Sequence, residues 1–180
     1  APPLPGAEQF PVPLLLTFPE LGSVLFETAD GGRDSALAAL NTLVLRLLSV
    51  SPAGRAIFTI LDPVGLGQSF SGLMHLADHE DRLINRRIWT QADQIEARLL
   101  ELNEHIEKVT QLYLRNEYRT IAEYNEQAGR IAEPYHVLVI ADLPAGFSEV
   151  AARRLLSVVN SGPRCGVFTL IHWDQRQPLP

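Results

Sequence analysis

Short apolar runs that alternate with helix-patterned segments constrain this chain more than any other feature. Val137–Ile140 is an uninterrupted aliphatic run, and Arg55–Leu61 is rich in β-branched and aromatic residues. Runs without polar alternation are typical of strands that are buried on both faces. Strands that alternate with helices favour a parallel sheet with helices on both sides. The pattern therefore predicts an α/β fold with a mainly parallel sheet flanked by helices.

The individual elements follow from periodicity and from capping residues. Strands are predicted at Ser23–Glu27, Arg55–Leu61, Val137–Ile140 and Val167–Ile171, with a brief one at Arg86–Thr90. Helices are predicted at Ser35–Ser49, Gln91–Asn116, Thr120–Ala128 and Gly146–Val159, the last one capped by Ser148. Val64–Asp81 is expected to be a mixed loop with short helical character.

Length and composition exclude several classes of protein. A chain of 180 residues fits one domain, and its 46% hydrophobic and 20% charged content excludes wholesale disorder. It has no apolar run long enough to cross a membrane and no secretory signal at its start. The single Cys165 excludes an intrachain disulfide and a cysteine-based zinc site. These features predict a cytoplasmic protein without a membrane segment.

Charge and proline content indicate how the domain relates to other parts of a longer protein. A chain with a net charge of −6 binds nucleic acid poorly without sequence specificity, so we expect any DNA contact to come from other domains. Prolines cluster near both ends and predict a domain over residues 21–174, between an N-terminal linker or edge strand (1–20) and a C-terminal linker (175–180). Pro11–Phe18 is the candidate edge strand. Because the sequence does not begin with Met, we expect it to be part of a longer polypeptide.

Several segments, in order, resemble the motor domain of the FtsK/SpoIIIE/HerA family of DNA translocases. The resemblance covers roughly residues 22–177. It rests on SALAALNTLVLRLL, FTILDPVGLG with Asp62-Pro63, LNEHIEKVTQLYLRNEYRTIAEYNEQ with Tyr124-Asn125, HVLVIADLPAGF, and SGPRCGVFTLIHWDQRQP. It implies a RecA-like, three-layer P-loop NTPase-type fold.

The segment that corresponds to the family's phosphate loop, Thr28–Ser35, departs from the motif G-x-x-x-x-G-K-[ST]. The loop keeps Gly31, Gly32 and the hydroxyl of Ser35, and Arg33 could contact a phosphate. It has no Gly-Lys pair, because Lys108 is the only lysine of the chain. The planar guanidinium of Arg33 is broader than the ammonium group of the motif's lysine and replaces it poorly. The resemblance therefore implies a degenerate, vestigial Walker A loop.

The other catalytic elements that the resemblance implies are also altered. At the Walker B position, Ala141 stands where the family has an Asp that holds Mg²⁺, and Asp142 stands where it has a Glu. At the closing strand, Trp173-Asp174 replaces the family's Thr-Gln sensor, and Gln175 follows one residue late. The candidate site is therefore the vestigial set of Gly31, Gly32, Arg33, Ser35, Asp142 and Gln175, with no metal site.

The resemblance and its departures together favour a non-catalytic FtsK-like domain of a larger DNA-translocase-type ATPase. Its role would be in structure, assembly or regulation. It would lie beside an active motor domain of the same polypeptide, and that polypeptide would form a homo-oligomer. No cofactor is expected. One alternative is a weakly active ATPase that binds ATP and Mg²⁺ through Arg33, Ser35 and Asp142. Another is a free-standing interaction module that assembles through the helix at 91–116.

Other residue patterns are weaker candidates. His75 and His79 could face one metal from a helix, but no third ligand is fixed by spacing, and we interpret them as a solvated polar segment. Cys165 is interpreted as a small buried residue and not as a nucleophile paired with His172.

Surface charge and the long helix leave two further alternatives. Two groups of arginines could contact DNA or a neighbouring subunit, but salt bridges among the many acidic residues are the favoured interpretation. These groups are Arg82, Arg86 and Arg87, and then Arg115, Arg119 and Arg130. The apolar stripe from Ile95 to Tyr113 is expected to pack against the sheet, with self-association as the alternative.

Overall fold

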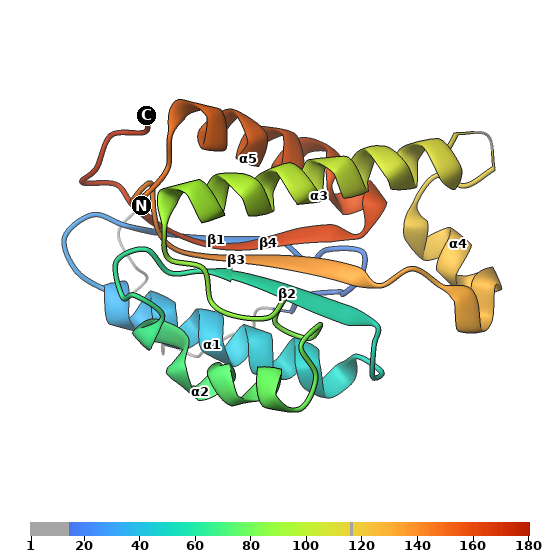
Figure 1. The fold of residues 1–180 in the computed structure, drawn as a ribbon, viewed down its shortest axis with the longest axis horizontal. Coiled ribbons are helices and arrows are strands. Elements are labelled where there is room, and N and C mark those ends of the chain that lie inside the picture. The colour runs from blue at the N-terminus through green and yellow to red at the C-terminus, as the bar shows by residue number, and fades with distance from the viewer. Residues whose placement is uncertain (1–14, 116) are drawn as a thin grey trace, which may run out of the picture.

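The computed structural model describes residues 15–115 and 117–180 and places a four-stranded parallel sheet at the centre (Figure 1). The strands are β1 (Val24–Thr28), β2 (Ala56–Leu61), β3 (Tyr135–Leu143) and β4 (Val167–Asp174). Their order across the sheet is β1-β4-β3-β2. The predicted α/β fold with a parallel sheet is confirmed, and each of the four main predicted strands is present.

Helices cover both faces of the sheet, as Figure 1 shows. The helices α1 (Arg33–Val50) and α2 (Ser71–Met74) lie on one face, and α3 (Ala92–Leu112) and α5 (Glu149–Ser161) lie on the other. The helix α4 (Ile121–Ala128) follows the far end of α3, and short 3-10 turns lie at Gln68–Phe70, His75–Asp78, Gly129–Ile131 and Pro163–Cys165. Each face of the sheet therefore has its own hydrophobic core.

Local sequence signals explain where the helices begin. The Ser148 hydroxyl accepts a hydrogen bond from the Ala151 N–H (3.1 Å), so the predicted cap of α5 is confirmed. The Thr120 hydroxyl caps α4 in the same way, through the N–H of Glu123 (3.3 Å). The Glu123 carboxylate in turn accepts from the Arg119 N–H (2.7 Å). Each cap satisfies a donor that the helix itself leaves without a partner.

The apolar stripe of α3 packs into the core on its face of the sheet. Its buried residues are Ile95, Leu99, Leu102, Ile106 and Val109. The stripe belongs to one hydrophobic cluster with buried residues of β3, β4 and α5. The prediction that it packs against the sheet is confirmed.

Three predictions need correction. The long helix ends at Leu112, earlier than predicted, and Tyr113 caps it: its N–H donates to the Val109 carbonyl (3.0 Å) and its hydroxyl donates to Glu133 (2.6 Å). The brief strand at Arg86–Thr90 is wrong except for one bridge, between Trp89 and Leu61. Of the candidate edge strand Pro11–Phe18, residues 11–14 lie outside the described residues, and residues 15–18 lead into a turn and form no strand.

The length and hydropathy of the described helices also bear on membranes. Among them, none combines the length and the apolar character that a membrane crossing needs.

Candidate functional site at the carboxyl ends of the strands

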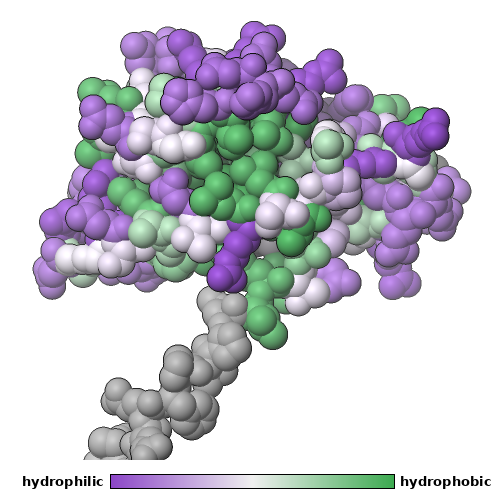
Figure 2. Space-filling view, turned by 90° about the horizontal axis from the view of Figure 1, so that it is seen from below, coloured by the Kyte–Doolittle hydropathy of each residue, from purple (hydrophilic) through white to green (hydrophobic). Residues whose placement is uncertain are grey.

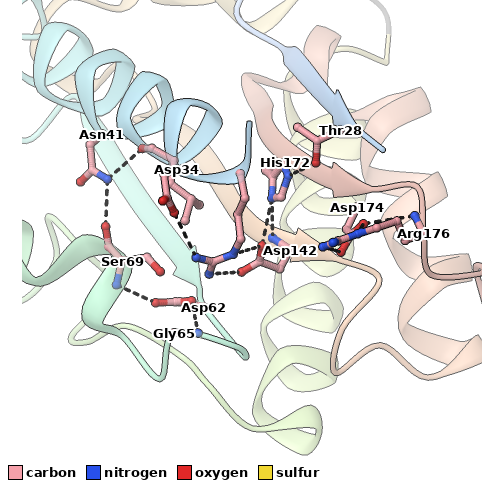
Figure 3. Close-up of polar contacts among 12 residues, drawn as sticks. Thr28, Asp34, Asn41, Asp62, Gly65, Ser69, Asp142, His172, Asp174 and Arg176 are labelled. Atoms are coloured by element: carbon pink, nitrogen blue, oxygen red, sulfur yellow. Dashed lines mark hydrogen bonds and ion pairs between the residues drawn. The ribbon is translucent and has the colours of Figure 1, made fainter. Parts of the chain in front are cut away.

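Polar side chains gather where the strands end, as Figure 3 shows. Thr28 ends β1, Asp62 follows β2, Asp142 lies near the end of β3, and Asp174 ends β4. Most buried residues are apolar, and the buried polar residues include three carboxylates at this edge: Asp62, Asp142 and Asp174. In parallel sheets the carboxyl ends of the strands form the usual ligand-binding edge. This edge is therefore the candidate functional site.

The position of Asp142 comes from an irregularity in β3. The pairing register between β3 and β4 shifts between Ile140 and Leu143, and Asp142 has a positive φ of 56°. A bulge of this kind bends a strand and changes the direction of a side chain. Asp142 tolerates the left-handed region better than most residues, because a short polar side chain can hydrogen-bond locally. The bulge thus presents a buried carboxylate to α1 and β4.

Arg33 binds this carboxylate from the first turn of α1. Its Nε donates to Oδ1 (2.7 Å) and its Nη2 donates to Oδ2 (2.6 Å), which makes a two-armed ion pair. The Asp142 side chain is 4% exposed and that of Arg33 is 35% exposed. The hydrogen bond to Asp142 is the main cause that raises the pKa of Arg33, with further contributions from the charges of Asp62 and Asp34. The guanidinium is therefore committed to carboxylates of its own chain.

His172 extends the cluster toward β1. Its Nε2 lies 2.8 Å from the Thr28 hydroxyl, and its Nδ1 lies 3.3 Å from the Asp142 N–H and 3.1 Å from Asp142 Oδ1. In one neutral tautomer Nδ1 accepts from the Asp142 N–H and Nε2 donates to Thr28. In the other, Nδ1 donates to the carboxylate. In either tautomer both ring nitrogens are engaged by groups of the protein.

Asp62 has a structural role at the end of β2. Its carboxylate accepts hydrogen bonds from the N–H groups of Gly65 (2.9 Å), Gly67 (3.0 Å) and Ser69 (3.1 Å). The Asn41 amide then links Leu37 of α1 to the Ser69 carbonyl (2.9 Å for each bond). The Asp-Pro end of β2 therefore organises the loop that connects to α2.

Asp174 and Gln175 close the site on the β4 side. Asp174 receives two guanidinium bonds from Arg176, Nε to Oδ1 (2.8 Å) and Nη2 to Oδ2 (2.7 Å). These bonds are the main cause that lowers the pKa of Asp174 well below its usual range. The Gln175 amide donates to Glu27 on β1 (2.8 Å). Gln175 therefore contacts the edge of the sheet and does not contact the Arg33–Asp142 pair.

The loop between β1 and α1 is short. Residues 29–32 separate the end of β1 from Arg33, whereas six residues precede the lysine in G-x-x-x-x-G-K-[ST]. Gly32 has φ 89° and stands directly before the helix. A cavity of about 510 Å³ lies beside the loop; its charged lining residues are Arg33 and Arg176 and, with opposite sign, Asp30 and Asp34. The formal charges of these four side chains cancel.

The predicted site residues separate into two groups. Gly31, Gly32, Arg33 and Ser35 all line this cavity, and Arg33 joins it to Asp142. Gln175 forms the second group, because it bonds Glu27 and does not contact the Arg33–Asp142 pair. Sequence reasoning missed the contacts of His172 and Arg176 with the site. Side chains alternate along β4, so a prediction that β4 lies between β1 and β3 would have placed His172 beside Asp142.

The other candidates lie outside this site. His75 is exposed and contacts Asp78 (Nδ1 to Oδ2, 3.2 Å), and within residues 15–115 and 117–180 no three His, Cys, Asp or Glu residues are grouped to hold a metal ion. Cys165 is buried, next to the Thr110 hydroxyl (3.3 Å), which confirms it as a core residue.

The arginine cluster has a different partner from the one predicted. Arg82, Arg86 and Arg87 are exposed, and none of the ion pairs between described residues involves them. Arg87 instead lies over the ring of Trp89, and Arg98 lies over the same ring (4.4 Å to the centroid in each case).

Comparison with known proteins identifies structures with a similar fold. No protein-family model matches the sequence, and no curated protein matches it. Among solved structures, EssC (ATPases 2 and 3) from Geobacillus thermodenitrificans has a TM-score of 0.65 at 16% identity, over 88% of this chain and 30% of that one. The cytoplasmic domain of the type VII secretion ATPase EccC from Thermomonospora curvata has a TM-score of 0.61 at 19% identity, over 86% and 18%.

A third similar structure is the pCW3 conjugation coupling protein TcpA in its monomer form with ATPγS. Its TM-score is 0.58 at 18% identity, over 86% of this chain and 44% of that one. The chain thus spans less than half the length of each of these proteins. The predicted RecA-like fold is confirmed: this chain has the fold of the FtsK/SpoIIIE-type ATPase domains found in secretion and conjugation proteins.

Proposed function

We propose that this chain is a non-catalytic FtsK-like domain whose nucleotide site is closed by an ion pair of its own side chains. It would serve assembly or regulation beside an active motor domain in a larger, oligomeric, DNA-translocase-type ATPase. The observation that carries the proposal is the two-armed bond between Arg33 and Asp142. Arg33 stands at the first position of the helix after β1, and Asp142 stands at the Walker B position of the resemblance.

The residues at this edge do not fit a bound MgATP. In working phosphate loops the backbone wraps the phosphates and a lysine reaches the β- and γ-phosphates. Here the loop is shorter, the only lysine lies in α3, and Arg33 is bound to a carboxylate. Asp30 and Asp34 add negative charge to the cavity wall where a triphosphate would enter. Asp142 would have to release Arg33 before it could act on a metal ion.

The alternative of a weakly active ATPase is favoured by one observation. The cavity beside the β1–α1 loop is large enough for a small ligand, and Arg33, Arg176 and Ser35 line it. A nucleotide that displaced Asp142 from Arg33 would find that guanidinium there, and it would find a second one only if Arg176 also left Asp174. This alternative needs the ion pair to open, which makes it testable through the same two residues.

Isothermal titration of the chain with ATP and Mg²⁺ separates the two functions. The proposal expects no binding at millimolar nucleotide, both for the natural chain and for Asp142→Asn. Arg153→Ala is the matched control, since Arg153 forms an exposed pair with Glu149 on α5. Micromolar binding that Arg33→Ala or Asp142→Ala abolishes, and Arg153→Ala leaves intact, would refute the proposal and support the ATPase.

The length of the similar proteins supports the assembly role. The secretion and conjugation proteins of similar fold are all at least twice as long as the part that this chain matches. We therefore infer that the partners are other domains of one polypeptide and further copies of it, and that any contact with DNA lies mainly in those domains. The stripe of α3 is buried in the core, so assembly through that stripe would require unpacking the domain.

A further inference from the structure

A polar cavity lies at the outer edge of β2, on the face of the sheet that α3 covers. Its floor comes from Ile57, Thr59 and His136, and α3 forms one of its walls. Ile57 pairs with His136 in the parallel register, so both side chains project to the same face of the sheet. The cavity has a volume of about 320 Å³, near the lower end of the range for small-molecule sites (about 300–1,000 Å³). It therefore suits a small ligand.

The segment that precedes α3 forms the other wall of the cavity. It runs along β2, where the Phe58 N–H donates to the Leu83 carbonyl (2.7 Å). It then turns through Asn85 (φ 48°) and Arg86 (φ 74°), two successive residues in the left-handed region. The Asn85 amide donates to the buried Thr59 hydroxyl (3.2 Å). Strained backbone positions cluster at functional sites, and this pair holds Asn85 in the lining of the cavity.

The charged residues of the lining favour an anion. Arg82 and Arg98 are positive and Glu101 is negative, so two guanidinium groups against one carboxylate leave a formal charge of +1. Arg98 gives one arm to Glu101 (Nη2 to Oε1, 2.5 Å) and lies over the ring of Trp89. Arg82 is exposed, and no ion pair between described residues involves it. Its guanidinium is therefore available to a ligand at the mouth of the cavity.

Two nitrogen atoms of the lining residues have no hydrogen-bond partner within residues 15–115 and 117–180. They are Arg98 Nε and His105 Nε2, and both atoms are buried. His105 packs against His136, with 4.2 Å between the ring centroids. Burial lowers the pKa of both rings, so each is neutral at pH 7 and donates through one nitrogen. Buried polar atoms without a partner are rare in folded proteins, and a ligand in the cavity is the partner that the chain itself does not supply.

The cavity is separate from the apolar surface of the molecule. Figure 2 shows the α1 side of the sheet, where hydrophobic residues form a continuous area. Leu16, near the start of the described residues, lines a groove on that side together with Val24 and Phe26 of β1. The cavity lies on the other face of the sheet and at the opposite edge, because β1 and β2 are the two outer strands. Its ligand is therefore recognised by the polar groups of its own lining.

We propose that this cavity binds a small oxyanion of the phosphate type, either free phosphate or the phosphate group of a small monoester. Arg82 binds the oxyanion with its planar fork at the mouth of the cavity. Arg98 and the Asn85 amide provide further donors, and Ile57 and Leu102 provide apolar wall for the organic part of a monoester. A triphosphate carries more negative charge than this lining neutralises. The proposal therefore goes beyond the closed nucleotide site and does not depend on it.

Isothermal titration of the 180-residue chain with inorganic phosphate and with glycerol phosphate tests the site. We expect saturable binding with a dissociation constant below about 1 mM. Arg82→Ala should weaken it by at least about tenfold, and Arg82→Lys by less, since lysine keeps the charge but loses the fork. Arg86→Ala is the matched control, because Arg86 is exposed in the same segment and does not line the cavity. Tighter binding of the ester identifies an organic phosphate as the ligand, and equal binding identifies free phosphate.

Proton NMR of the histidine rings locates the bound anion. The ring signals of His105 and His136 should shift as phosphate is added, and those of the exposed His75 should not. His172 reports on the other polar cavity, beside the β1–α1 loop, because it contacts the carboxylate that binds Arg33. A shift of the His172 signals without a shift of the His105 signals would place the anion in that other cavity and overturn the proposal.

Two results of the titration would also overturn the proposal. One is the absence of binding at about 10 mM of either phosphate compound. The other is an equal loss of affinity in Arg82→Ala and Arg86→Ala, which would indicate attraction to surface charge alone. Circular dichroism confirms that each variant is folded. Nucleotide binding that Arg33→Ala abolishes and Arg82→Ala leaves intact would refute the closed-site proposal only, so the two proposals succeed or fail separately.

Discussion

Arg33 and Asp142 lie 109 residues apart in the sequence and meet in a two-armed ion pair, with N–O distances of 2.7 and 2.6 Å. Arg33 is the first residue of α1, which follows β1, and Asp142 lies on the bulge of β3. The pair therefore ties α1 to the central part of the sheet. It occupies the polar edge at which proteins with parallel sheets usually bind ligands.

Removing Arg33 should destabilise the fold. In Arg33→Met the buried Asp142 carboxylate would lose its cation, and we expect a loss of about 2–3 kcal/mol of unfolding free energy, less than for a wholly buried pair because Arg33 is partly exposed. Adding Asp142→Asn should restore most of this loss, since an amide carries no charge and asparagine tolerates a positive φ. Urea denaturation of both variants measures the difference.

The matched control for that experiment is Arg153→Met on the surface of α5. Its pair with Glu149 is exposed, with 3.5 Å between nitrogen and oxygen. Its loss should cost no more than about 0.5 kcal/mol. Equal losses for Arg33→Met and Arg153→Met would show that the Arg33–Asp142 pair has no structural role.

The loop after β2 should depend on Gly65. A Cβ at this position would clash with the Ser69 hydroxyl and would lie 2.6 and 2.7 Å from the two Asp62 carboxylate oxygens, so Gly65→Ala must shift both the hydroxyl and the carboxylate that holds three backbone N–H groups. We expect a loss of about 2 kcal/mol, against little change for Gly72→Ala, where a Cβ meets nothing within 4 Å. Thermal unfolding of the two variants compares them. A Gly65→Ala protein as stable as Gly72→Ala would contradict the role of Asp62.

The thiol of Cys165 should be unreactive in the folded protein. It is buried, with the Thr110 hydroxyl at 3.3 Å and the Ile106 carbonyl at 3.7 Å. A disulfide reagent such as dithiobis(nitrobenzoate) must therefore wait for local or global opening. Slow release of the coloured thiolate in buffer and rapid release of one equivalent in denaturant are expected. Rapid reaction in buffer would show that the core around Cys165 opens readily.

Sequence reasoning predicted the fold because its signals are local. Uninterrupted apolar runs identify buried strands, and Ser148 identifies the start of α5, since hydrophobic periodicity and capping depend on neighbouring residues alone. The end of α3 was less predictable. The apolar pattern continues through Tyr113, whose hydroxyl bonds Glu133, twenty residues further along the chain, and a contact at that separation has no local sequence signal.

The contacts of the site could not be predicted in the same way. Arg33 and Asp142 were both identified as site residues, yet their direct bond depends on the bulge in β3, and a positive φ at an aspartate leaves no clear sequence pattern. Sequence proximity relates His172 to Cys165, whereas its actual partners Thr28 and Asp142 come close to it only through the strand order β1-β4-β3.

Acid should destabilise the protein through His136. Burial is the main cause that lowers its pKa from 6.5 to about 3, and the neighbouring ring of His105, 4.2 Å away between centroids, lowers it further. Burial also lowers the pKa of His105, against the charge of Glu133. The folded state therefore binds fewer protons than the unfolded state between about pH 3 and 6.5. Stability is complete above pH 6.5 and falls as the pH decreases through this range.

Between pH 7 and pH 5 we expect His136 to account for at most about 2 kcal/mol of lost stability. Urea denaturation at both pH values should show a smaller loss for His136→Gln than for the natural chain. His75→Gln is the control, because His75 is exposed and contacts only Asp78 among its described side-chain partners. The same pH dependence in the natural chain and in His136→Gln would mean that His136 is protonated in the folded state as easily as in the unfolded one.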